Sequence, residues 1–155
     1  MIIRPRRNRA SESIRNMVCE TRLSPADLLA PLFVLDQKSA KEEIKTLPGQ
    51  FRLGLTEILE ECSSLQKLGV PSIALFPVVG NHLKTRTGEI SADQNFFYYK
   101  VIAEIRNKFP TLAIMTDVAL DPYSSDGHDG IVDPKSGEVL NDETLEILEK
   151  MALLQ

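Results

Sequence analysis

The sequence predicts an α/β fold built on a parallel sheet. Three apolar runs of strand length alternate with three amphipathic segments of helix length along the 155 residues. This alternation indicates βαβ units, and runs that are apolar throughout are typical of parallel strands covered on both faces. A doubly wound sheet and a (β/α)8 barrel both fit the order, but a complete barrel requires roughly 200 residues or more.

The first βα unit begins after a short helical turn. Ser24 and Pro25 are typical of the N-cap and the first position of a helix. The apolar run 28–35 predicts a buried strand, although Pro31 weakens this prediction because proline cannot donate to a strand ladder. Residues 36–54 are polar and punctuated by glycine and proline, so we expect a loop there.

An amphipathic helix is predicted over 56–68, where apolar residues recur at helical spacing. Gly69 suits the position after the helix, and Pro71 prevents any continuation. Cys62 lies on the apolar stripe, which indicates a small core residue rather than a nucleophile.

The second unit is predicted from the apolar run 72–79, which indicates another buried strand. A polar loop over 80–88 follows it. Ser91 and Gln94 have the spacing of a capping box, which predicts a helix that runs to about Lys108.

The third unit comprises a strand over 111–120, a Gly- and Asp-rich loop over 121–141 and a helix from Asp142 onward. Asn141 is the expected N-cap, and acidic residues fill the first turn, where the helix dipole favours them. The expected buried face of this helix consists of Leu145, Leu148 and Ala152.

Composition excludes several classes of protein. The formal net charge is −4, and 43% hydrophobic with 26% charged residues is ordinary for a globular chain. No apolar run approaches the roughly 18 residues of a membrane span, and two widely spaced cysteines argue against a disulfide framework. Residues 1–22 are rich in arginine, but nothing else supports binding to nucleic acid. A solvated terminus, an organelle presequence and a contact with an acidic neighbouring subunit stay open for this segment.

The candidate chemistry follows the third strand. Asp117 stands near the carboxyl end of that strand, where barrels and open α/β sheets place their sites. Burying a carboxylate there costs free energy, so we expect it to have a charged or hydrogen-bonded partner or a role in the chemistry. The next loop carries Asp121, Asp126 and Asp129, which glycines between them allow to converge. Clustered carboxylates suit hard cations such as Mg²⁺, and an exposed turn-rich loop is the alternative.

Several segments of the chain match family motifs in order. The most specific runs from 117 to 130 (DVALDPYSSDGHDG) and continues at 131–133 (IVD) and 139–144 (VLNDET). The others are 4–7 (RPRR), 20–23 (ETRL), 31–34 (PLFV), 47–52 (LPGQFR) and 74–77 (ALFP). Together they resemble the N-terminal half of the delta-aminolevulinic acid dehydratases, also called porphobilinogen synthases, over essentially the whole chain.

The resemblance implies a (β/α)8 barrel, of which residues 24–155 carry the first three βα units, preceded by an N-terminal arm at 1–23. It implies an enzyme that condenses two molecules of 5-aminolevulinate to porphobilinogen, with loss of water, in tetrapyrrole and haem biosynthesis. The family's arm wraps a neighbouring subunit, usually in an octamer. We therefore expect a cytoplasmic homo-octamer with no nucleic-acid or membrane partner; a plastid enzyme is the alternative if a presequence has been removed.

The resemblance also implies roles for the loop after the third strand. One variant of the family binds a catalytic zinc through three cysteines, and the matching positions here are Ala119, Asp121 and Asp129. Carboxylates favour Mg²⁺ over zinc, and Ala119 removes one ligand, so we expect Mg²⁺ at Asp121 and Asp129 or no tightly held metal. Asp117 is expected to assist proton transfer beside the Schiff-base chemistry. The expected pocket wall consists of Tyr123, Ser124, Ser125 and His128.

Some groups that the family requires are missing from these residues. Its two Schiff-base lysines lie in the second half, and no lysine here has the desolvated or cation-adjacent setting that such a lysine needs. The sequence also ends inside an apolar helix. We therefore expect a piece of a longer enzyme that is inactive alone. A non-catalytic half-barrel that docks on a partner and an unrelated metal-binding α/β protein are the alternatives.

Overall fold

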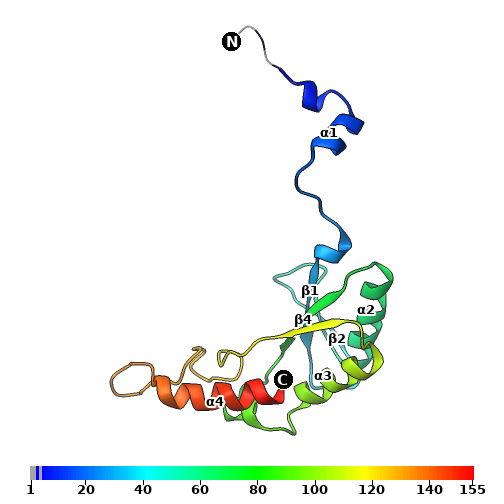
Figure 1. The fold of residues 1–155 in the computed structure, drawn as a ribbon. Helices are drawn as coiled ribbons and strands as arrows, with labels where there is room; N and C mark the ends of the chain where they lie inside the picture. The colour runs from blue at the N-terminus through cyan, green and yellow to red at the C-terminus, as the bar shows by residue number, and fades with distance from the viewer. Residues whose placement is uncertain (1–2, 4) are drawn as a thin grey trace.

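The computed structural model describes residue 3 and residues 5–155, so Arg4 of the RPRR motif lies outside the described residues. The described residues form one sheet in the order β2-β3-β1-β4-β5, in which every neighbouring pair is parallel except β2 and β3 (Figure 1). The strands are β1 (Leu29–Val34), β2 (Lys41–Glu43), β3 (Phe51–Leu53), β4 (Ser72–Pro77) and β5 (Ala113–Thr116). The α-helices are α1 (Glu12–Val18), α2 (Leu55–Lys67), α3 (Phe97–Lys108) and α4 (Asn141–Leu154).

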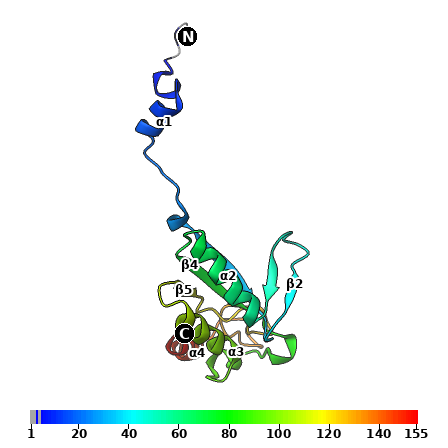
Figure 2. The same cartoon turned by 90° about the vertical axis from the view of Figure 1, so that its right-hand side faces the viewer.

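One face of the sheet is covered by helices and the other is open. Leu32 and Leu75 are register partners on the first face, and both are buried in the core that α2 and α3 complete (Figure 2). The opposite face carries Phe33 and Phe76, whose ring centroids are 5.8 Å apart, and Met115, which is 51% exposed. The expectation that these strands are covered on both faces is therefore wrong for this chain, because α2 and α3 lie on the same face.

Pro31 is tolerated in β1 because of its place in the sheet. The Leu35 N–H donates to the Leu53 carbonyl of β3, and backbone groups alternate between the two sides of a strand. The Pro31 nitrogen therefore faces the same side as that of Leu35. Because β3 pairs only with the last two residues of β1, the missing donor costs no ladder hydrogen bond. The first predicted strand is thus confirmed despite its proline.

The predicted loop over 36–54 is wrong, because it contains β2 and β3. These strands are three residues long, and β2 is charged and exposed throughout, so no hydrophobic alternation marks them. Hydrogen bonds fix the segment instead. In the first turn of α2, the Glu57 carboxylate accepts from the Ser39 hydroxyl and from the Ala40 N–H. These two bonds lower the pKa of Glu57 below its ordinary value of 4.5, so the charged form holds the segment in place at neutral pH.

The end of α2 confirms the sequence prediction. Its buried side chains, Ile58, Cys62 and Leu65, follow the predicted stripe. Gly69 has a φ of +80°, and the N–H groups of Gly69 and Val70 donate to carbonyls in the last turn of α2. This is the Schellman arrangement that a glycine after the helix permits. Burial raises the pKa of the Cys62 thiol to about 11, as expected for a core cysteine.

The capping box predicted at Ser91 is wrong, because α3 begins only at Phe97. Ser91 lies inside a 3-10 turn, Glu89–Ala92, and is fully buried, with its carbonyl accepting from the Tyr99 hydroxyl. The chain then turns at Asp93, whose carboxylate accepts from the Asn95 N–H at 2.8 Å. Burial of the turn therefore decides where α3 starts, and that burial cannot be predicted from the spacing of Ser91 and Gln94.

The third unit differs from its prediction in three details. β5 ends at Thr116, so Asp117 begins the following loop instead of interrupting a strand. Asn141 is the first residue of α4, and no side chain caps that helix. The buried face is also different: Leu145 and Ala152 are exposed and Leu148 is only half-buried. The buried residues of α4 are Thr144 and Met151. Because α4 is apolar on more than one side, its contact with the Glu89–Ala92 turn decides which side is buried.

Residues 5–23 extend away from the α/β body (Figures 1 and 2). α1 packs on a 3-10 turn, Arg7–Arg9, and neither element contains a buried residue. The Ser11 hydroxyl caps α1 by accepting from the Ile14 N–H at 3.2 Å. Within the described part of the chain, no helix is long and apolar enough to cross a membrane.

Candidate active site

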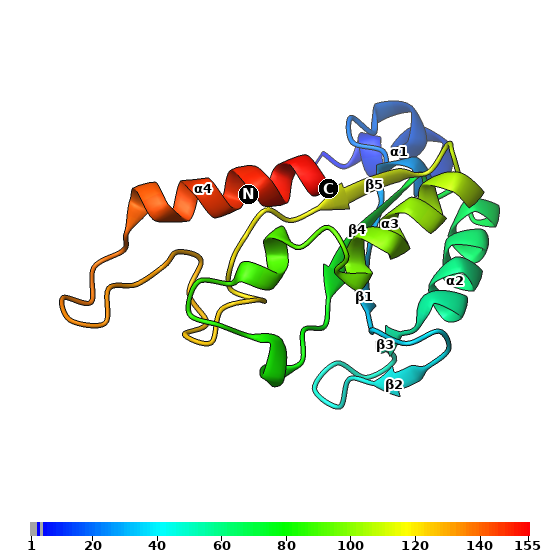
Figure 3. The ribbon, with the colours of Figure 1, turned by 90° about the horizontal axis from the view of Figure 1, so that it is seen from below.

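The candidate site lies at the carboxyl edge of β4 and β5, where two loops begin. Residues 78–96 follow β4, and the aspartate-rich loop, residues 117–133, follows β5. The two loops run side by side (Figure 3). Thr85 and Ser124 form an isolated parallel bridge, and the Ser125 N–H donates to the Thr85 carbonyl at 2.9 Å. This edge is where α/β proteins place ligand-binding and catalytic groups.

Gly88 allows the two loops to approach each other closely. It has a φ of +63°, which favours glycine, and a Cβ at this position would lie 3.0 Å from Leu120 Cδ2 and 3.4 Å from Tyr123 Cβ. Leu120 and Tyr123 are each 1% exposed. The aspartate-rich loop is therefore anchored in the core near its start, and Gly88 provides the space for that anchor.

Three carboxylates gather on the exposed side of this loop. The Asp121 carboxyl group interacts with that of Asp129, and the Asp117 carboxylate repels it. Partial burial, the bond with Asp129 and the repulsion from both neighbours raise the pKa of Asp121 above its ordinary value of 3.8. The expectation of a buried Asp117 is wrong, because all three residues are exposed. Such a cluster can hold and release a proton.

The four residues expected to form a pocket wall divide into two pairs. Tyr123 and Ser124 are 1% and 3% exposed, so they anchor the loop. Ser125 and His128 are exposed and can be reached from solvent. Among the described residues, the Tyr123 hydroxyl has no hydrogen-bond partner, and burial raises its pKa, which keeps it a neutral donor. His128 Nδ1 accepts from the Gly130 N–H at 3.0 Å, and this hydrogen bond does not use Nε2.

The donor set of the loop fits Mg²⁺ better than zinc. Cys62 is buried on α2 and Cys19 lies in the segment before the sheet, so neither thiol belongs to this loop. Ala119 offers no ligand, and the described residues contain no group of three or more His, Cys, Asp or Glu placed to hold a metal ion. Asp121 and Asp129 remain, and Mg²⁺ is commonly held by one or two carboxylates with water completing its shell.

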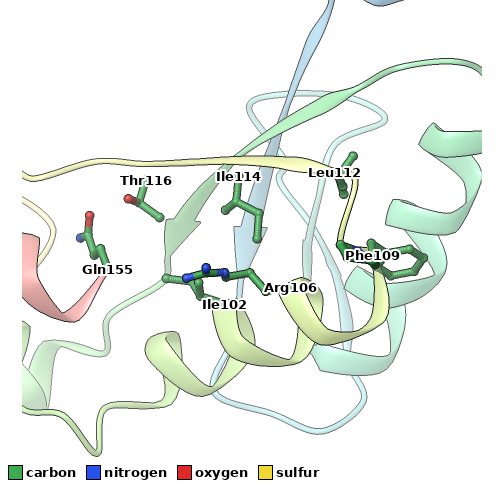
Figure 4. Close-up of a pocket in the computed structure, with 8 residues that line it drawn as sticks. Ile102, Arg106, Phe109, Leu112, Ile114, Thr116 and Gln155 are labelled. Carbon is green, nitrogen blue, oxygen red and sulfur yellow. The ribbon is translucent and has the colours of Figure 1, made fainter.

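A groove of about 320 Å³ lies between α3 and the edge strand β5 (Figure 4). The Arg106 side chain runs along it, and Gln155 stands at one end. The Gln155 Nε2 donates to the Asp117 carbonyl at 3.1 Å. Arg106 is the one titratable residue in the groove's lining, so the groove holds no acid–base pair and no metal-ligand set. The chemistry-bearing residues are those of the aspartate-rich loop.

Two residues that shape the site were not predicted. Gly88 follows Thr87 in a polar loop, which is typical of a turn, but its role in spacing the loops depends on contacts distant in sequence. Arg86 has no motif around it, yet its Nε lies 3.5 Å from Asp126 Oδ2. Both residues gain their roles only when the loops after β4 and β5 lie side by side.

Comparison with known proteins identifies relatives along the whole chain. The sequence model of the delta-aminolevulinic acid dehydratase family matches residues 2–155. The delta-aminolevulinic acid dehydratase of Chlamydia pneumoniae is 45% identical over 151 residues, which are 97% of this chain and 45% of that protein. The chloroplastic enzyme of Glycine max is 43% identical over 153 residues, 98% of this chain and 37% of that protein.

The fold agrees with the same family. A crystal structure of the delta-aminolevulinic acid dehydratase (porphobilinogen synthase) from Toxoplasma gondii ME49, in complex with the reaction product porphobilinogen, superposes with a TM-score of 0.93 at 38% identity. The match covers 99% of this chain and 44% of that one, which confirms the expected partial (β/α)8 barrel. The chain spans less than half the length of these relatives. It belongs to the delta-aminolevulinic acid dehydratase family.

Proposed function

We propose that this chain forms part of a porphobilinogen synthase, which condenses two molecules of 5-aminolevulinate to porphobilinogen with loss of water. One observation carries the proposal: a carboxylate cluster stands at the carboxyl edge of β5 in a chain that superposes on a product complex of that enzyme with a TM-score of 0.93. The substrate carries a ketone and an amine, so the condensation requires repeated proton transfers that a carboxylate can perform.

Within this site, Asp117 is the group best placed to transfer protons. It directly follows β5, and its carbonyl is held by the Gln155 side chain. Burial raises the pKa of Tyr98 and Tyr123, and the nearby Asp117 carboxylate adds to that rise. Asp117 therefore borders both the core and the exposed cluster. We assign it the acceptance and return of protons beside the reacting carbonyl, with Ser125 and His128 as groups that contact substrate.

The Schiff-base lysines that the family resemblance implies have no counterpart in residues 1–155. The ketone carbon of 5-aminolevulinate forms an imine with a lysine amine and releases water. Borohydride adds hydride to that imine carbon and leaves a stable amine. Treatment of the full-length protein with substrate and borohydride is expected to modify lysines outside residues 1–155 and none within them. Peptide mass spectrometry locates the adduct.

Two controls test whether an adduct requires the ketone of 5-aminolevulinate. Borohydride without 5-aminolevulinate must leave every lysine unmodified, and 4-hydroxypentanoate, which has no ketone, must give no adduct. A full-length protein that forms no adduct contradicts the proposed function and favours the non-catalytic half-barrel. An adduct confined to lysines of residues 1–155 contradicts the division of catalytic groups between the two parts.

We further propose that Asp121 and Asp129 hold Mg²⁺ weakly and that the loop holds no zinc. Two carboxylates with water suit Mg²⁺, whereas a tight zinc site needs more protein ligands than this loop offers. The ion would balance the charge of the carboxylate cluster. The chain's own contribution is the pair of carboxylates, which Gly88 and the buried Tyr123 hold in position.

Addition of 10 mM Mg²⁺ is expected to raise the melting temperature of the chain, because an ion bound only by the folded state stabilises it. For a dissociation constant of about 1 mM the gain is roughly 1.4 kcal/mol. Asp129→Asn should remove most of the shift, and Asp142→Asn, at an exposed aspartate in the first turn of α4, should keep it. Equal shifts in wild type and Asp129→Asn would exclude this pair as the site.

For assembly and location, we propose a cytoplasmic homo-oligomer, an octamer formed through the N-terminal arm. The arm supports this because α1 buries no residue within its own chain. Residues with unpartnered surfaces that project from the body are suited to contact another subunit. The plant relatives named chloroplastic, such as that of Glycine max, keep a plastid location as the alternative.

A further inference from the structure

Arg86 contacts the aspartate-rich loop at two separated points. Its Nε lies 3.5 Å from Asp126 Oδ2, and its guanidinium donates to the Val132 carbonyl. These points stand on either side of His128 and Asp129 in the sequence. One side chain from the loop after β4 therefore spans the base of the segment 127–131, which carries two of the candidate functional groups.

Other contacts fix the ends of this segment differently. Before it, the Ser125 N–H donates to the Thr85 carbonyl at 2.9 Å. After it, the Ile131 N–H donates to the Thr144 hydroxyl, which ties the chain to α4. Among the hydrogen bonds of the described residues, the one from Arg86 to Val132 is the link between residues 78–96 and the far end of the segment. Arg86 thus joins the two ends of the segment through one side chain.

The geometry indicates that the Arg86 contact positions the aspartate-rich loop and contributes little to the stability of the fold. The Arg86 and Asp126 side chains are 44% and 36% exposed, and an ion pair at that exposure contributes little to folding. A planar guanidinium can nevertheless donate to a carboxylate and a carbonyl at once, with fixed angles between the two bonds. The pair is also the one salt bridge found in the described part of the chain.

We propose that Arg86 is a positioning residue of the candidate site: it clamps Asp126 and the Val132 carbonyl and so holds the segment 127–131, with His128 and Asp129, in one conformation. Asp129, one of the two proposed Mg²⁺ ligands, lies inside that segment. The predicted effect on kcat/KM rests on the proposed function, whereas the predicted effect on hydrogen exchange in the loop does not.

The test compares Arg86→Gln, Arg86→Lys, Asp126→Asn and the double variant Arg86→Gln/Asp126→Asn in the full-length protein. Hydrogen exchange is measured on peptides that cover 127–131, together with kcat, KM and melting temperature. Arg106→Gln is the matched control, because Arg106 lies on α3 in the groove of Figure 4 and, among the described residues, forms no ion pair with either loop.

Arg86→Gln is expected to increase exchange over 127–131 by about tenfold, the scale of a lost hydrogen bond to a charged group. It should lower kcat/KM by a similar factor, with the melting temperature unchanged within two degrees or so. Asp126→Asn should have a smaller effect, because the Val132 bond remains. The double variant should match Arg86→Gln, and Arg86→Lys should recover part of the loss. Arg106→Gln should behave as wild type.

Two results would overturn the proposal. If exchange over 127–131 and kcat/KM in Arg86→Gln stay within twofold of wild type, the clamp has no role. If exchange rises equally across the chain and the melting temperature falls, Arg86 stabilises the fold and does not position the loop. A wild-type protein without activity would instead reject the proposed function, and the exchange data would still decide the role of Arg86.

Discussion

Asp117→Asn in the full-length protein is expected to lower kcat for porphobilinogen formation by on the order of 10²- to 10⁴-fold, the range for removing a positioned acid–base group. Asparagine keeps the shape of the side chain but cannot take up the proton. Asp117 is exposed at the end of β5 and is not part of the core. The melting temperature should therefore stay close to that of wild type while kcat falls. Steady-state kinetics with 5-aminolevulinate and a thermal melt measure the two quantities.

Glu104→Gln provides the matched control for this prediction. Glu104 is an exposed carboxylate on α3, away from the aspartate-rich loop in sequence, and its change to an amide should leave kcat within about twofold of wild type. If Asp117→Asn also retains kcat within threefold of wild type, Asp117 has no part in proton transfer. The site would then have to be assigned to other residues.

Leu75→Ala should destabilise the chain by about 2–5 kcal/mol, the range for truncating a fully buried leucine. Leu75 is 0% exposed in the middle of β4, and its carbonyl accepts from the buried Tyr98 hydroxyl at 2.7 Å. Its side chain fills the layer between the sheet and the helices. The truncation would leave a cavity beside Tyr98. Urea denaturation measures the loss as a lower transition midpoint at unchanged slope.

Leu68→Ala removes the same atoms from the surface and serves as the control. Leu68 is 68% exposed after the last turn of α2, so its truncation should change the free energy of unfolding by no more than about 0.5 kcal/mol. Equal losses in the two variants would show that the layer between β4 and the helices is not the main core of the chain.

The sequence predicted reliably those features that depend on residues adjacent in the chain. The stripe of α2 and its closing Gly69 were predictable, because the helical period and the left-handed turn are properties of adjacent residues. The start of α3 was not, because Ser91 has a capping pattern but is drawn into a buried 3-10 turn. The short strands β2 and β3 were missed because their hydrogen bonds to distant residues, not hydrophobic alternation, hold them.

The sequence indicated most of the residues of the candidate site, but it did not predict their exposure or their contacts. The glycines of the loop predicted that Asp121, Asp126 and Asp129 converge, but Asp126 pairs with Arg86, and the neighbours of Asp121 are Asp129 and Asp117. Their exposure could not be read from the sequence, because it depends on where β5 ends. Tyr123 was expected in the pocket wall, and its burial could not be read from the sequence because it depends on packing against the loop after β4. Arg86 acts across two loops, and contacts between loops leave no periodic signal in one sequence.

The most direct test of the account is a crystal structure of the full-length protein with porphobilinogen bound. The central claim is that the carboxyl edge of β4 and β5 faces the reacting molecules. It predicts the product at this edge, with the Asp117 carboxylate within hydrogen-bonding distance and Ser125 or His128 in contact. Porphobilinogen bound in the groove beside Arg106, or elsewhere with the aspartate-rich loop unoccupied, would contradict that claim.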